Sequence, residues 1–168
     1  MTNLDNMDLN ILAELSTNAR ESFVDIGKRL NLHPNVVAYR VNKLKEKGII
    51  KGYTIDLDFE KLGAMEQVYI AGSIQNHSQR DRVLKEIAAI PQAVRVTSFL
   101  GTPETMVFFL GKNKSDVDMI ISKMKELEMK IDYTASVIKS YENGQIPEFL
   151  RMLAREAETR RTNNISGR

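Results

Sequence analysis

Residues 22–48 read SFVDIGKRLNLHPNVVAYRVNKLKEKG, and this stretch decides how the N-terminal part of the chain folds. It contains two short runs of apolar residues at helical spacing. Ser22 offers an N-cap to the first run, and Pro34 suits the first turn of the second, where a proline lacks only an N–H that is unpaired anyway. Only Leu32 and His33 separate the two runs. Such a brief connection makes the helices cross steeply, as in a helix-turn-helix.

A preceding helix and an extended segment complete this unit. Asp5 offers an N-cap for a first helix, and Gly48 ends the last one. The residues after Gly48 read as extended chain up to Leu57. We therefore predict a helix-turn-helix domain over residues 1–52 and an extended linker over residues 53–63.

A different pattern, in the order βαββαβ, occupies residues 64–142. The expected elements are a strand at 68–74, a helix at 83–88, strands at 94–96 and 105–110, a helix at 117–127 and a strand at 131–137. This order is that of a ferredoxin-like domain, in which two helices cover one face of an antiparallel sheet. The other face carries Tyr69, Phe99 or Phe109, and Ile138, depending on the strand register. Because nothing in the chain covers that face, it predicts self-association.

A C-terminal helical extension is expected over residues 143–168. Pro147 suits its start, whereas periodicity is lost from Thr162 onward, where we expect the end to fray. The extension is basic, and three roles are open for it: packing on the second domain, covering an assembly surface, or adding contacts to DNA.

The composition narrows the class of protein. With 168 residues, 42% of them hydrophobic and 27% charged, the chain fits one mid-sized or two small folded domains. No apolar run approaches the roughly 20 residues that cross a bilayer, and the N-terminus lacks a signal-peptide layout. We therefore expect a cytoplasmic protein with no membrane partner.

Enzymatic and metal chemistry is disfavoured as well. The chain has no cysteine, so disulfides and thiolate metal sites are excluded. Its two histidines, His33 and His77, both fall where turns are expected. No glycine-rich phosphate loop is present. We expect no catalytic residue, no metal and no cofactor.

Positive charge gathers around the second helix of the helix-turn-helix, although the net charge is only +2. Positions 33–52 carry one arginine and four lysines against Glu46 alone. A solvated helix surface is the simplest interpretation of such a run. In a helix-turn-helix, however, this helix lies in the major groove of DNA.

The outward residues of this helix are candidates for reading bases. With Val37, Val41 and Leu44 facing inward, they are Asn35, Ala38, Tyr39, Asn42 and Lys43. Asparagine can pair with adenine, lysine can reach guanine, and alanine can touch a thymine methyl group.

A second set of residues is expected to contact the DNA backbone. Lys45, Lys47 and Lys51 are candidates for phosphate contacts, with solvated lysines as the alternative. For Arg40 we favour a phosphate or an internal acid over a base.

Three stretches resemble the leucine-responsive regulatory protein (Lrp/AsnC) family of bacterial and archaeal transcription regulators. They are Leu4-Asp5-x-x-Asp8-x-x-Ile11-Leu12, Asn18-Ala19-Arg20, and Val37-x-x-Arg40-Val41-x-x-Leu44-x-x-x-Gly48-Ile49-Ile50-x-Gly52-Tyr53. The resemblance continues through Asp58-x-x-Lys61-Leu62-Gly63 and covers about residues 4–142.

The resemblance implies a fold and a set of partners. The fold class is α+β, with an N-terminal winged helix-turn-helix domain and a C-terminal ferredoxin-like βαββαβ domain. The family's second domain dimerises through its sheets and senses small molecules, usually amino acids, and its dimers often assemble further, commonly to octamers. The expected partners are double-stranded DNA with a pseudo-palindromic operator, further copies of the chain, and a free amino acid.

The resemblance also places an effector site. It implicates Gly101, Thr102, Glu104, Thr134 and Ser136, in the region where the family holds its amino acid between neighbouring dimers. The alternative is an ordinary polar turn beside a solvent-facing strand. The family's usual Gly-x-x-Asp is here Gly101-Thr102-Pro103-Glu104, so this chain binds a different amino acid or none. The family's usual Ser or Thr before the recognition helix is also replaced, by His33, which predicts a weaker cap.

The function we predict is a sequence-specific DNA-binding transcription regulator that responds to an amino acid. The alternative is an architectural protein that coats DNA with little sequence preference and has no effector.

Overall fold

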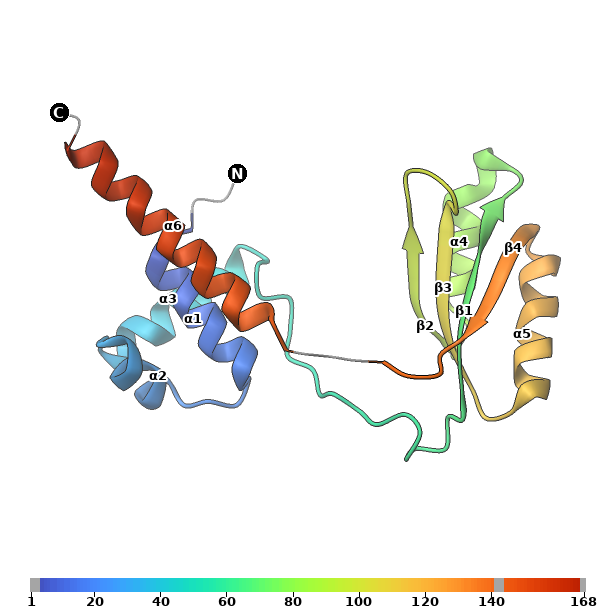
Figure 1. Ribbon diagram of the computed structural model, residues 1–168, viewed down its shortest axis with the longest axis horizontal. Helices are drawn as coiled ribbons and strands as arrows, with labels where there is room; N and C mark the ends of the chain where they lie inside the picture. Colours follow the sequence, from blue (N-terminus) through green and yellow to red (C-terminus); the bar gives the residue numbers. More distant parts are fainter. Residues whose placement is uncertain (1–3, 141–143, 167–168) are drawn as a thin grey trace. The chain divides into compact units, whose positions relative to one another are not determined.

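In the computed structural model, which describes residues 4–140 and 144–166 and side chains as far as residue 160, the chain divides into two units (Figure 1). One unit combines Met1–Ile55 with Glu142–Arg168, and the other is Asp56–Tyr141. The expected domain boundary between residues 142 and 143 lies outside the described residues.

Three short helices form the N-terminal part of the first unit, each with a side-chain cap at its start. They are α1 (Asn6–Thr17), α2 (Phe23–Leu30) and α3 (Pro34–Glu46). Asp5 and Asp8 form a reciprocal capping box on α1, in which the Asp8 N–H donates to Asp5 Oδ1 at 2.8 Å. Ser22 Oγ accepts from the Asp25 N–H at 3.1 Å, and His33 Nδ1 accepts from the Asn35 N–H at 3.2 Å. His33 therefore caps α3 in place of the serine or threonine that is usual in the family.

The turn between α2 and α3 depends on a glycine. A Cβ atom at Gly27 would lie 2.6 Å from the carbonyl oxygen of Leu32, so a larger residue there would push the turn open. The turn brings the apolar faces of the three helices together. Their common core consists of Ile11, Leu15, Ile26, Val37 and Val41, with Phe23, Leu30, Leu32 and Ile50 packed against it.

A long helix, α6 (Ile146–Ser166), also belongs to the first unit and packs along α1 (Figure 1). Of the three roles that the sequence left open, packing on the second domain is therefore not what the structure shows, whereas covering an assembly surface and adding contacts to DNA remain open. The helix extends to Ser166, past Thr162, from which fraying was expected. Each added residue makes one more backbone hydrogen bond, so a helix can extend beyond its last apolar contact.

Residues 51–58 form neither helix nor strand, and hydrogen-bonded turns follow in the remainder of the segment predicted as the linker, residues 53–63. The Leu62 N–H donates to the Asp58 carbonyl at 3.2 Å, and the Gly63 N–H donates to the Glu60 carbonyl at 2.9 Å. No helix among the described residues has the length and apolar character needed to cross a membrane.

The second unit is a four-stranded antiparallel sheet with two helices on one face (Figure 1). Its elements are β1 (Glu66–Ile74), a 3-10 turn (His77–Gln79), α4 (Arg80–Ala88), β2 (Ala93–Ser98), β3 (Thr105–Gly111), α5 (Lys114–Glu126) and β4 (Met129–Ser136). The strand order is β2-β3-β1-β4, and every neighbouring pair is antiparallel. The predicted ferredoxin-like βαββαβ arrangement is confirmed.

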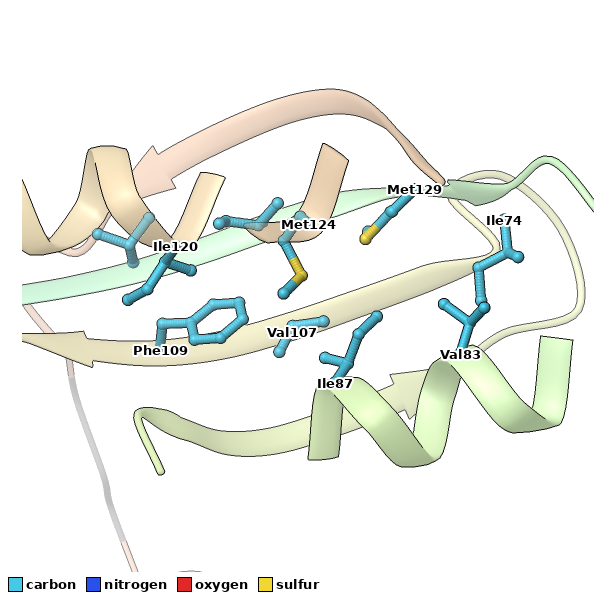
Figure 2. Close-up of a cluster of buried hydrophobic side chains, with 10 residues drawn as sticks. Ile74, Val83, Ile87, Val107, Phe109, Ile120, Met124 and Met129 are labelled. Atoms are coloured by element: carbon cyan, nitrogen blue, oxygen red, sulfur yellow. The ribbon is translucent and has the colours of Figure 1, made fainter. Parts of the chain in front are cut away.

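The core of this unit lies between the sheet and the two helices (Figure 2). Val83 and Ile87 reach it from α4, and Ile120 and Met124 from α5. Phe109 of β3 also points into this core and is 1% exposed. Of the two phenylalanines considered for the uncovered face, Phe109 is therefore ruled out, whereas Phe99 is exposed.

The uncovered face of the sheet carries aromatic side chains. Tyr69 of β1 lies opposite Phe108 of β3, with 4.8 Å between their ring centroids. Tyr133 of β4 is half exposed and lies opposite Ala71. An apolar surface of this kind is typical of an interface between protein chains.

Candidate functional site

Helix α3 separates a buried face from an exposed polar face. Val37 and Val41 are fully buried, and Leu44 is 1% exposed. Asn35, Tyr39 and Asn42 are all exposed, and their spacing of four and then three residues aligns them on one side of the helix, opposite the core. This line therefore contains two amides and a phenol that are free of the core. Ala38, at the edge of the line, is partly buried.

Lysines flank this line of residues, and two of them lie close to aromatic rings. The Lys43 ammonium lies 5.8 Å from the centre of the Tyr39 ring, and the Lys45 ammonium lies 5.1 Å from that of Tyr53. Lys43 also donates to Glu46 Oε2 at 2.7 Å, and this hydrogen bond is the main reason that the pKa of Lys43 is raised. The remaining two predicted phosphate contacts, Lys47 and Lys51, are exposed.

Arg40 is bound within the unit. Its Nη1 donates to Asp5 at 2.8 and 2.9 Å and to Asp8 Oδ1 at 2.7 Å. Burial lowers the pKa of Arg40, but the hydrogen bonds to the two carboxylates outweigh this effect and the net shift is upward. Of the alternatives for Arg40, the structure therefore provides the internal acid. The same contacts attach the recognition helix to the first turn of α1.

The residues expected to bind an effector fall into two groups at different places in the second unit. Gly101, Thr102 and Glu104 lie in the loop between β2 and β3, next to Thr105, which pairs with Gly72 of β1. Thr134 and Ser136 lie on β4, where they pair with Ile70 and Val68 of β1. Ser136 is thus displaced from the loop by four residues along β1, about 13 Å, and lies on the opposite side of that strand. One chain does not bring the two groups together.

An arginine outside the predicted set holds the loop between β2 and β3. Arg80, the first residue of α4, donates through Nη2 to Ser98 Oγ at 2.8 Å and to the Glu104 carbonyl at 3.1 Å. Its Nη1 lies 3.8 Å from Glu104 Oε2, an oxygen that accepts no hydrogen bond from any residue that the structure describes. The negative charge of Glu104 therefore already faces a cation.

Comparison with known proteins finds transcriptional regulators. The family described as "Winged helix-turn-helix DNA-binding" matches residues 4–51. An uncharacterized HTH-type transcriptional regulator of Pyrococcus horikoshii is 32% identical over 124 residues, which is 73% of this chain and 83% of the relative. The transcriptional regulator LrpC of Bacillus subtilis is 35% identical over 88 residues, 52% of this chain and 60% of LrpC.

Solved structures agree with this result. The structure of B. subtilis LrpC superposes with a TM-score of 0.76 at 26% identity, covering 84% of this chain and 99% of LrpC. The chain belongs to the Lrp/AsnC family. It is accordingly a transcriptional regulator with a winged helix-turn-helix for DNA. The feast or famine regulatory protein of Mycobacterium tuberculosis, in a complex with L-methionine, shares the fold with a TM-score of 0.78 at 17% identity, covering 84% of this chain and 97% of that protein.

Two residues of this Lrp/AsnC chain lie beside the predicted site residues but were not among them. Val36 is 39% exposed on α3 and lies one turn before Tyr39 and two turns before Lys43, so its spacing alone could have identified it. Arg80 gave no such signal, because its partners lie 18 and 24 residues further along the chain.

Proposed function

We propose that this regulator reads its operator with the exposed face of α3. The observation that supports this most strongly is the alignment of Asn35, Tyr39 and Asn42 opposite a fully buried face. Amides at such positions can form paired hydrogen bonds with adenine, and Val36 offers an apolar contact to thymine. Lys45, Lys47 and Lys51 lie within or shortly after the same helix, where they supply phosphate contacts. Arg40 does not read bases, because Asp5 and Asp8 hold it.

The proposed assembly is a homodimer through the uncovered sheet face, with higher oligomers such as octamers formed from it. Tyr69, Phe108 and Tyr133 give this face its apolar surface. Two recognition helices related by a two-fold axis match a pseudo-palindromic operator, with half-sites about one turn of DNA (about 34 Å) apart or a multiple of it.

The proposed effector is a free amino acid, bound at the loop between β2 and β3. Support comes from the structural relative in complex with L-methionine and from the polar side chains of Thr102 and Glu104. Because Thr134 and Ser136 lie away from this loop, a ligand that contacts both groups must lie between chains. Binding would then favour the assembly that completes the site. The protein acts in the cytoplasm, without catalysis and without a cofactor.

A binding competition tests the DNA half of this proposal. A duplex selected by the protein from random sequence should bind about a thousandfold more tightly than bulk duplex at the same salt concentration. Asn42→Ala should relax the preference for one base of the selected duplex and so lower this ratio. Lys47→Ala should weaken binding to the selected and the bulk duplex by the same factor. Equal affinity for selected and bulk duplex would instead identify the architectural coating protein.

Isothermal titration with the common amino acids tests the effector half. At least one amino acid should release or absorb heat and change the oligomer size, and Glu104→Gln should weaken its binding tenfold or more. The matched control is Glu126→Gln, a charge-neutralising change on the exposed surface of α5. If no amino acid gives heat or changes the oligomer size, the proposed sensing is refuted.

A further inference from the structure

Helix α6 covers a second apolar face of α1. Ile11 and Leu15 of α1 belong to the core shared with α2 and α3. Leu9 and Ala13 are also buried, at 7% and 0% exposure, but successive helical residues are about 100° apart, which places these two on the opposite side. Among the described residues, α1 packs against α2, α3 and α6 (Figure 1). Since α2 and α3 lie on the side of Ile11 and Leu15, α6 is the element that covers Leu9 and Ala13.

The face that α6 presents to α1 is small and apolar. Ala154 is 3% exposed, and Pro147 at the start of the helix is buried. Leu150, Leu153 and Ala157 are partly buried on the same helix. Met152, by contrast, is 44% exposed. The two sides of α6 can therefore be distinguished by single substitutions.

An ionic network joins α6 to the helix-turn-helix. Arg151 Nη2 lies 3.4 Å from Glu14 Oε1, and the other oxygen of Glu14 accepts from Arg29 Nε of α2 at 2.6 Å. The Glu14 side chain is 14% exposed, so water screens these contacts only partly. One carboxylate of α1 thus binds both α2 and α6.

Helix α1 in turn holds the recognition helix. The carboxylates of Asp5 and Asp8, in its N-cap and first turn, bind Arg40 of α3. A helix that fixes α1 from behind therefore influences the setting of α3. In the sequence, α6 follows β4 after residues 137–145, so it connects the second unit back to the DNA-binding unit.

We infer that α6 is a docking strap, and that the form in which it is docked on α1 is the form that binds the operator tightly. When α6 is released, Leu9 and Ala13 lose their cover and Glu14 loses one of its two arginines. In the DNA-binding unit, α1 and α3 are then fixed less firmly in position. By linkage, operator DNA must favour docking by the same factor by which docking favours operator binding.

Single cysteines measure the docking directly, because the chain has none of its own. Ala154→Cys places a thiol in the contact with α1, and Met152→Cys places one on the exposed side of the same helix. The probe is a disulfide thiol reagent, which reacts only with accessible thiols. We expect Cys at position 154 to react at least tenfold more slowly than Cys at position 152. A saturating concentration of a duplex that the protein selects from random sequence should slow the thiol reaction at position 154 by roughly a further fivefold or more. The reaction rate at position 152 should not change.

Undocked protein tests the reciprocal effect. Ala154→Glu places a charge in the contact with α1, and Met152→Glu adds the same charge on the exposed side. The operator affinity of Ala154→Glu should be lower than that of the unmodified chain. The factor should equal the one by which DNA slows the thiol reaction at position 154. Met152→Glu should keep the affinity of the unmodified chain. The cysteine measurement stands even if Ala154→Glu fails to fold. Equal thiol reactivity at the two positions would disprove docking. If the thiol at position 154 is protected but DNA does not change its protection, α6 only covers α1 and the proposed link to operator binding is refuted.

Discussion

Arg40 shows why a basic residue in a recognition helix need not contact DNA. Its side chain is 24% exposed, and the guanidinium donates three hydrogen bonds to Asp5 and Asp8, whose carboxylates would repel each other without it. The arginine therefore serves to position α3 on α1. Asn42 on the same helix is exposed and contributes nothing to this contact.

We expect Arg40→Ala to lower the free energy of unfolding by about 2 kcal/mol, because charge-assisted hydrogen bonds are lost and two part-buried carboxylates lose their cation. Asn42→Ala should leave stability unchanged to within about 0.5 kcal/mol and should still weaken operator binding. Urea unfolding and DNA titration of both variants check this. Unchanged stability of Arg40→Ala would contradict the positioning role.

Asp25 provides a pH-dependent contact at the start of α2. A hydrogen bond from Ser22 Oγ, at 2.6 Å, is the main reason that the pKa of Asp25 lies below its ordinary value of 3.8, and Lys28 adds to the effect. Because the folded pKa is below the unfolded one, the contact stabilises the folded state above about pH 3.8. Its contribution is lost as the pH falls through the lower, folded value.

Ser22→Ala should raise the pKa of Asp25 back toward 3.8, because the hydroxyl donor is gone. An NMR titration of the Asp25 carboxyl measures the change, with Ser16→Ala, an exposed serine of α1, as the control. A pKa for Asp25 that does not move in Ser22→Ala would show that Lys28 rather than Ser22 sets it.

At the scale of elements, the turn between α2 and α3 decides the geometry of the helix-turn-helix. Gly27→Ala would drive a Cβ against the Leu32 carbonyl. We expect a net loss of about 1–2 kcal/mol in the free energy of unfolding, even though alanine favours a helix by about 1 kcal/mol. Gly52→Ala, just before the linker, where no atom lies within 4 Å of the added Cβ, should change stability far less. Chemical unfolding of the two variants compares them, and equal stabilities would contradict this view of the turn.

The sequence predicted most elements correctly where the signal was local. Asp5 and Ser22 mark the starts of α1 and α2, and each lies three residues from its hydrogen-bond partner, whereas Pro34 marks the start of α3 as its first residue. Alternation likewise identified β1, β2 and β4, whereas a nearly continuous apolar run identified β3. The orientation of Phe109 was left open because Thr105–Gly111 is nearly all apolar, and only the register with β1 decides which side chains face the helices. The extent of α6 was missed because its last turns carry no apolar pattern.

At the scale of the whole molecule, long-range contacts could not be read from the sequence. The placement of α6 on α1 joins residues that are 137 positions apart, as in the Arg151–Glu14 pair, and amphipathicity indicates that a helix has a partner without naming it. The contact of Arg80 with the loop before β3 was missed for the same reason. The predicted effector residues and base contacts remain predictions.

Assembly through the uncovered sheet face gives a further prediction. Tyr69→Asp would place a charge beside Phe108 in the proposed interface, so we expect the dimer to dissociate at concentrations where the unchanged chain is fully assembled. Met119→Asp is the matched control, since this exposed methionine lies on α5, on the other side of the unit. Light scattering after size-exclusion chromatography gives the masses. A dimer that survives Tyr69→Asp and not Met119→Asp would place the interface on the helices.

We propose that α3 reads a specific operator and that an amino acid modulates this reading. The test is to recover the genomic fragments that the purified protein binds at about 150 mM salt. The recovery is carried out with the unchanged chain and with Asn42→Ala, each with and without a pool of amino acids. We expect a shared pseudo-palindrome whose occupancy changes with the pool, and a relaxed preference at one base pair of each half-site in Asn42→Ala. Enrichment of fragments without any shared motif, equal in both proteins, would contradict it.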